Sequence, residues 1–194
     1  MRWLGAAALV VLAAMPAVAH DPNAVIPRPD QAGLPGLGGP FSLIDAHGDR
    51  RTSAEFRGKL LLVTFGFTDC PDVCPLELQT VSQALDLVGP AVAAKVAPLF
   101  ITVNPTRDTP ARMATFLAAF HPGMIGLTGS MAEVGAVVRA YKVHVTYSPD
   151  RDPAKVNHSA VQYLMAPDGS LASVLLPGTS AEDIASRLRK YAKN

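Results

Sequence analysis

An apolar run from Leu60 to Phe67 leads directly into a turn that holds the only two cysteines of the chain, Cys70 and Cys74. A short apolar run that ends in turn residues predicts a buried strand, and apolar residues at helical spacing after the turn predict a helix over 75–88. The chain is therefore expected to fold around a strand, a thiol-bearing turn and a helix. Function should be sought first at that turn.

Other elements alternate along the chain in the same way. Thr109 and Ser130 stand where helix N-caps are expected, and Ser130 has the capping-box pattern. The remaining predicted elements are an N-terminal hairpin (41–45 and 51–53), strands over 96–103 and 125–127, a second hairpin (159–165 and 171–176) and a helix over 180–192. This order predicts an α/β domain of parallel strands with crossover helices, closed by an antiparallel hairpin, with the thiols at the carboxyl end of a central strand.

The N-terminal residues differ from the rest of the chain. Residues 1–19 contain a basic start, an uncharged stretch and the sequence Ala17-Val18-Ala19, which together predict a signal peptide. The uncharged stretch is marginal for a bilayer span, which needs about 20 apolar residues, so an uncleaved anchor is the alternative. Residues 20–40 are rich in proline and glycine and predict a linker, and 41–194 predict one domain. We expect a periplasmic protein, soluble after cleavage or anchored to the outer face of the inner membrane.

The thiol pair is suited to redox exchange, to a local disulfide or to capture of a soft metal ion. Pro75 fits the first position of a helix, which predicts Cys74 as the N-cap and Cys70 in the preceding loop. At such a place the positive end of the helix dipole favours the thiolate over the thiol. We therefore expect a reactive pair that can bind metal.

A candidate for a third metal ligand lies far along the sequence, although a histidine taken alone is more often a hydrogen-bonded residue of the core or its rim. His158 follows Asn157 at the start of the second predicted hairpin, from which its imidazole would face the thiol turn. Two thiolates and one imidazole can hold copper as Cu(I) or Cu(II), with an open face for passing the ion on. A structural zinc site would need a fourth ligand, for which only Asp69 or Asp72 is near in sequence. These two aspartates otherwise serve as turn formers that influence thiol acidity.

Three segments of the chain resemble the Sco/SenC family: 67–75 (FTDCPDVCP), 104–110 (NPTRDTP) and 157–159 (NHS), followed by Tyr163-Leu164 and Pro167-Asp168-Gly169. The resemblance implies a thioredoxin-like fold with a central mixed sheet flanked by helices, and Cys70, Cys74 and His158 as copper ligands. Many family members have aspartate where this chain has Asn104 and Asn157. A group beside a ligand can orient it, so Asn157, Asp69 and Asp72 are candidates for that role.

The function implied by the resemblance is that of an exported copper metallochaperone for the dinuclear copper centre of a respiratory cytochrome c oxidase. Its expected partners are the copper-site subunit of that oxidase and a periplasmic thiol reductant or copper donor. The net charge of +1, without blocks of like charge, argues against a nucleic-acid partner. The main alternative is a thiol-disulfide oxidoreductase that uses Cys70 and Cys74 to reduce the cysteines of the partner's copper site. A thiol peroxidase and a non-catalytic copper sensor also fit, so enzymatic activity is left open.

Overall fold

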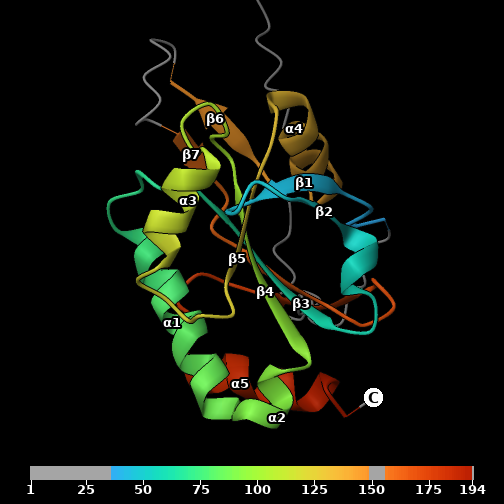
Figure 1. Cartoon of the computed structure of the whole chain (residues 1–194). Coiled ribbons are helices and arrows are strands. Elements are labelled where there is room, and N and C mark those ends of the chain that lie inside the picture. The colour runs from blue at the N-terminus through green and yellow to red at the C-terminus, as the bar shows by residue number, and fades with distance from the viewer. Residues whose placement is uncertain (1–35, 149–155, 194) are drawn as a thin grey trace, which may run out of the picture.

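The computed structural model describes residues 36–148 and 156–193, and a seven-stranded mixed sheet forms the centre of this part of the chain (Figure 1). The strand order is β2-β1-β5-β4-β3-β8-β9, in which β3, β4 and β5 run parallel and the other pairings are antiparallel. The strands are β1 (Ser42–Asp45), β2 (Arg50–Thr52), β3 (Leu60–Gly66), β4 (Val96–Thr102), β5 (Ile125–Thr128), β8 (Gln162–Met165) and β9 (Leu171–Leu175). The sheet agrees with the mixed α/β sheet expected from the sequence.

Helices cover both faces of the sheet. They are α1 (Val73–Val88), α2 (Pro90–Ala93), α3 (Pro110–Leu117), α4 (Met131–Ala140) and α5 (Ala181–Tyr191), with a 3-10 turn, η1, at Ser53–Phe56. The predicted caps are confirmed, since Thr109 accepts from the Arg112 N–H and Ser130 forms a capping box with Glu133. The short α2 and η1 were not predicted.

Strand β3 is buried on both faces, and its alternating side chains explain how the layers form. Leu60 and Leu62 pack with α1 and α5, whereas Leu61, Val63 and Phe65 pack with residues of α4 in the larger core cluster. Successive side chains of a strand point to opposite faces, so α1 and α5 cover one face of the sheet and α4 the other. Because neither face of β3 is exposed to solvent, its sequence is a continuous apolar run, and this run is the feature from which the strand was predicted.

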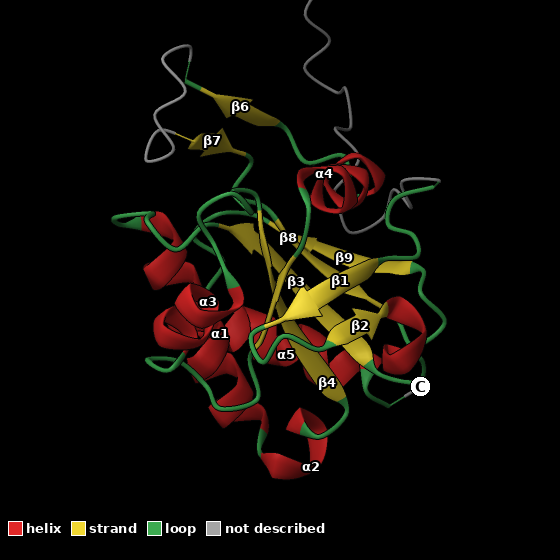
Figure 2. Cartoon of the chain, turned by 45° about the horizontal axis from the view of Figure 1, so that its top comes forward, coloured by secondary structure: helices red, strands yellow, loops and turns green. Residues whose placement is uncertain are grey.

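A separate two-stranded ribbon stands apart from the main sheet, as Figure 2 shows. It consists of β6 (Val145–Tyr147) and β7 (Val156–His158), which pair antiparallel with Val145 opposite His158. The prediction that His158 opens the hairpin strand that now appears as β8 is therefore wrong. The ribbon is fastened to the body by the Tyr147 hydroxyl, which donates to the Val103 carbonyl at 2.8 Å just beyond the end of β4.

The predicted leader, 1–19, and most of the predicted linker, 20–40, lie outside the described residues. The described end of the linker packs on the domain, because Leu37 is buried and the Gly38 N–H donates to the Ala140 carbonyl at 2.9 Å. Within 36–148 and 156–193, none of the helices combines the length and the apolar character that crossing a bilayer requires.

Candidate metal centre

Cys70 and Cys74 lie at the carboxyl end of β3, where the chain turns into α1. The helix begins at Val73 with Asp72 as its N-cap, so the prediction that Cys74 is the N-cap is wrong. Asp72 makes no side-chain capping bond; instead the Cys74 N–H donates to Cys70 Sγ at 3.4 Å. Proline at the third helical position is tolerated because the first amides of a helix lack intrahelical partners. The Cys70 sulfur thus takes the place of a capping oxygen.

The two thiols have different environments, and both are free. Cys74 is fully buried against Leu78, Phe100 and Met113, whereas Cys70 is half-buried. Burial raises the pKa of the Cys74 thiol, and the Cys70 side chain raises it further, while a hydrogen bond from the backbone of Phe67 opposes the shift. Burial therefore favours the protonated thiol at Cys74, whereas the sequence predicted that the helix dipole would favour the thiolate.

Gly66, the last residue of β3, allows Cys74 to approach the strand. A Cβ at this position would lie 2.8 Å from Cys74 Sγ and 2.6 Å from Phe100 Cε2, closer than carbon and sulfur atoms normally pack. The thiol and the aromatic ring therefore occupy the space that any other residue at position 66 would need.

We expect Gly66→Ala to lower the free energy of unfolding by about 1–3 kcal/mol, because the added methyl group overpacks the site beneath Cys74. Urea unfolding measures this loss. Gly135→Ala in α4 is the matched control, since its Cβ would meet only the end of the flexible Arg139 side chain, at 3.3 Å. The control should be neutral or slightly stabilising, and an equal loss in both variants would contradict the steric role of Gly66.

The His158 imidazole approaches Cys74 from the β6–β7 ribbon. Its Nε2 lies 3.9 Å from Cys74 Sγ, although 84 positions separate the two residues. Its Nδ1 lies 3.0 Å from the Ser159 carbonyl oxygen, which can only accept, so we assign the ring hydrogen to Nδ1 and the lone pair to Nε2. Burial lowers the pKa of His158, partly opposed by the Ser159 contact, and favours the neutral ring. Phe67 holds the ring edge-on, with centroids 5.9 Å apart.

This arrangement is suited to a metal ion shared by sulfur and nitrogen. Using zinc bond lengths of about 2.3 Å to sulfur and about 2.0 Å to nitrogen, an ion would hold its two donors roughly 3.5–3.7 Å apart. The observed 3.9 Å between Cys74 Sγ and His158 Nε2 is close to that span. No cluster of three or more His, Cys, Asp or Glu side chains in the described ranges is compact enough to be a metal site as it stands. For Cys70, Cys74 and His158 to bind one ion together, the turn or the ribbon would have to move.

The thiol turn is held in place by Asp108, a residue to which the sequence analysis assigned no role. The buried Asp108 carboxylate accepts from the Thr68 N–H at 3.1 Å, the Thr68 hydroxyl at 2.6 Å and the Thr102 hydroxyl at 2.5 Å. These bonds join the turn to the end of β4 and the start of α3. Asn104 is also buried, and its carbonyl accepts from the Arg107 and Asp108 amides, so it shapes the turn that carries Asp108.

The three residues expected beside the ligands occupy different places. Asp69 is bound by two guanidinium groups, with Arg107 Nε at 2.7 Å and Arg112 as the second partner. This pairing engages both carboxylate oxygens, so Asp69 anchors the turn to α3. Asp72 is exposed at the start of α1, and Asn157 is exposed on β7, where alternation places it on the face opposite His158.

A further carboxyl group, on Glu77, lies one helical turn after Cys74 and was also missed. Glu77 Oε2 is, among the described residues, the one buried side-chain oxygen or nitrogen without a hydrogen-bond partner. Burial raises the pKa of Glu77 to about 7. An acidic residue three positions after the buried cysteine, next to the apolar positions of the helix, was the available signal in the sequence.

We expect Glu77→Gln to stabilise the protein at pH 8 by about 1–2 kcal/mol and to have little effect at pH 4. The native carboxyl, with a pKa of about 7 instead of 4.5, binds its proton more tightly than the unfolded chain does, so stability falls as pH rises through that window. The full shift would correspond to about 3 kcal/mol, which we reduce because the side chain is partly exposed. Urea unfolding at several pH values measures the gain, and a gain independent of pH would contradict this origin.

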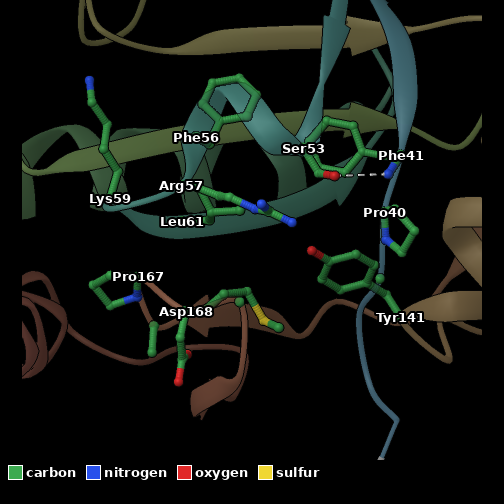
Figure 3. A pocket seen from close by; sticks show the side chains of 14 residues that line it. Pro40, Phe41, Ser53, Phe56, Arg57, Lys59, Leu61, Tyr141, Pro167 and Asp168 are labelled. Carbon is green, nitrogen blue, oxygen red and sulfur yellow. Dashed lines mark hydrogen bonds between the residues drawn. The ribbon is translucent and has the colours of Figure 1, made fainter.

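A cavity of about 330 Å³ lies at the opposite end of β3, near its start (Figure 3). Figure 3 shows the Arg57 side chain and the Tyr141 hydroxyl reaching into it, between the Phe41 ring and Pro167. None of the predicted ligands lines this cavity, so it is not part of the thiol site.

Comparison with known proteins gives one consistent family. The SCO1/SenC family model matches residues 29–193. "Protein sco1" of Schizosaccharomyces pombe is 41% identical over 181 residues, covering 89% of this chain and 69% of the relative. "Protein SCO1 homolog, mitochondrial" of Homo sapiens is 40% identical over 173 residues, covering 86% of this chain and 58% of the relative. The chain thus spans little more than half of the human protein.

Solved structures agree with these relatives. The structure of Bradyrhizobium japonicum ScoI with copper bound is 40% identical, with a TM-score of 0.74, and the match covers 80% of this chain and 99% of that one. The fold is therefore thioredoxin-like, as expected. The expected periplasmic location is contradicted, because the relatives from Homo sapiens, Arabidopsis thaliana and Saccharomyces cerevisiae are named as mitochondrial proteins. A leader-like segment in the sequence does not by itself show to which compartment the protein is transported.

Proposed function

The chain belongs to the SCO1/SenC family, and we propose that it is a copper metallochaperone that delivers copper to the dinuclear copper centre of cytochrome c oxidase. Sco proteins are cytochrome c oxidase assembly proteins, and solved relatives hold copper. In this proposal Cys70, Cys74 and His158 bind the ion, the copper-site subunit of the oxidase receives it, and a thiol reductant or copper donor prepares the site. The proposal includes transport of the chain across a membrane before it acts, without assigning the compartment.

The observation that carries the proposal is the approach of His158 Nε2 to Cys74 Sγ at 3.9 Å. A dithiol that only exchanged disulfides would not need a neutral imidazole with its lone pair facing the buried sulfur. The Ser159 carbonyl accepts from Nδ1–H, which is the arrangement that fixes a metal-binding histidine in the correct tautomer. The donor set is soft enough for Cu(I) and retains one nitrogen for Cu(II).

Metal analysis before and after reduction tests this proposal. Reduced protein should bind one copper ion, and protein with Cys70 and Cys74 joined should bind poorly, because a disulfide offers no thiolate. Absorption and paramagnetic resonance spectra of the Cu(II) form should show both sulfur and nitrogen ligation. Equal copper uptake by the oxidised and reduced protein would reject these sulfurs as the site.

A second candidate, the thiol-disulfide oxidoreductase, is favoured by the difference in burial between the thiols. Cys70 is half-buried and Cys74 is buried, as expected for an attacking and a resolving thiol. Cys70 thiolate would attack a partner disulfide and form a mixed disulfide, releasing one partner thiolate. The Cys74 thiol would then pass its proton to the released partner thiolate and attack Cys70 Sγ, which forms the Cys70–Cys74 disulfide and releases the second partner sulfur as a thiolate. The partner is thereby reduced by two electrons and this chain is oxidised.

A further inference from the structure

A groove of about 570 Å³ runs beside the thiol turn, between the start of α1 and the loop that joins β9 to α5. Val73 and Leu76 line it from α1, and Leu176 lines it from the loop. Six large apolar side chains are exposed in the described part of the chain, and these are three of them. Leu76 is 69% exposed and Leu176 is 54% exposed. Such a concentration of exposed apolar side chains in one groove is typical of an interaction surface.

The apolar lining of the groove arises because α1 carries apolar side chains on two of its faces near its start. The face with Leu78, Val81 and Leu85 is buried against the sheet and α5. Val73, Leu76 and Thr80 follow a second line at helical spacing and face the groove. The buried face of α1 supports the fold, and the second face contacts no core cluster.

The charges in the groove are of one sign. Glu77 and Glu182 line it, and the lining contains no lysine or arginine. Glu77 Oε2 is the buried oxygen without a hydrogen-bond partner described above. Burial raises the pKa of Glu77 to about 7, and a cation close to this carboxyl would favour its ionised form. The groove therefore offers apolar contacts together with two carboxyl groups, on Glu77 and Glu182, that suit a basic side chain.

We propose that this groove docks a segment of the copper-recipient protein that carries apolar side chains and a lysine or arginine whose nitrogen donates to Glu77. This inference rests on the proposed copper delivery. Val73 is the residue before Cys74, so a segment seated in the groove places its neighbouring residues at the mouth of the thiol site. Docking there would position the recipient's own copper ligands for transfer of the ion.

Calorimetric titration of the copper-loaded protein with the apo copper-binding domain of the oxidase subunit tests the proposal. Leu76→Ser, Leu176→Ser and Glu77→Gln should each weaken this association by about tenfold, as expected for residues at the centre of an interface. At limiting recipient, the rate of copper transfer should also fall in each of these three variants. Copper affinity of the leucine variants, measured by competition with a chelator, should remain within about twofold of the wild type.

Leu87→Ser provides the matched control, because Leu87 is an exposed leucine on the same helix but does not line the groove. It should leave association and transfer unchanged. Glu77→Gln distinguishes a docking role of Glu77 from a purely structural one, because it should stabilise the free protein at pH 8 and yet weaken its association with the recipient. A purely structural role for Glu77 would not produce opposite effects on folding and association.

Three results would overturn the proposal. If the groove variants bind the recipient as tightly as the wild type and transfer copper at the wild-type rate, docking occurs elsewhere and copper delivery itself is unaffected. Groove substitutions that change the sedimentation of the isolated protein would show that a second copy of this chain fills the groove. Wild-type protein that binds copper but never transfers it would remove both copper delivery and the docking site that rests on it.

Discussion

Reduced Cys74→Ser protein is expected to bind Cu(I) at least about 1000-fold more weakly than the wild type, a loss of about 4 kcal/mol. Cys74 is fully buried and lies 3.9 Å from His158 Nε2, so its sulfur is the central donor of the proposed site. A serine hydroxyl is a hard, weakly acidic donor that does not replace a thiolate for a soft ion. Cys70→Ser should lose binding to a similar extent. Competition against a Cu(I) chelator under reducing conditions measures both.

Met131→Leu is the control for this experiment, since Met131 is an exposed, sulfur-containing residue at the start of α4, far along the chain from the thiol turn. Its affinity for Cu(I) should equal that of the wild type. Oxidised wild-type protein should behave like the serine variants. Tight binding by Cys74→Ser would mean that the ion is held by Cys70 and His158 without the buried sulfur, which the geometry does not favour.

Local patterns in the sequence were sufficient to predict most of the fold. The apolar run that forms β3 was recognisable because that strand is buried on both faces. Thr109 and Ser130 mark the starts of α3 and α4 through hydrogen bonds within three residues. Features whose cause lies in neighbouring residues can be read from one sequence, and so the α/β order and the position of the thiol turn were correct.

Predictions at the site were wrong where a distant or unusual partner decides the geometry. Cys74 was expected as the N-cap because the residue before a proline usually avoids the helical conformation. The helix nevertheless begins at Val73, and Cys70 Sγ accepts the Cys74 N–H. Sulfur in the place of a capping oxygen is not part of the usual capping pattern, so sequence reasoning did not anticipate it.

Long-range contacts were the other source of error. His158 belongs to the β6–β7 ribbon, whose pairing joins residues on either side of 149–155. Asp108 supports the thiol turn through Thr68, forty positions earlier. Neither contact leaves a periodic signal near the residues involved. The resemblance to a family supplied the ligand set, but the residues that hold it in place became apparent only in three dimensions.

His158→Ala is expected to weaken copper binding by about 10-fold to 1000-fold, or about 1.4 to 4 kcal/mol, while disulfide exchange stays near the wild-type rate. The dithiol does not depend on the imidazole, whereas the third copper donor is lost. Cu(II) should suffer more than Cu(I), because two thiolates still suit the monovalent ion. Affinity for each oxidation state and the rate of exchange with a model disulfide measure these effects. His144→Ala, an exposed histidine near the ribbon, should change neither.

The same variant separates the two candidate functions in cells. If copper delivery is the function, assembly of the oxidase copper centre should fail with His158→Ala and recover at least partly when copper is added, because excess ion compensates for weakened binding. If thiol reduction is the function, assembly at limiting copper should be normal with His158→Ala and fail with Cys70→Ser or Cys74→Ser. The approach of a neutral imidazole to the buried thiol at 3.9 Å favours the first outcome.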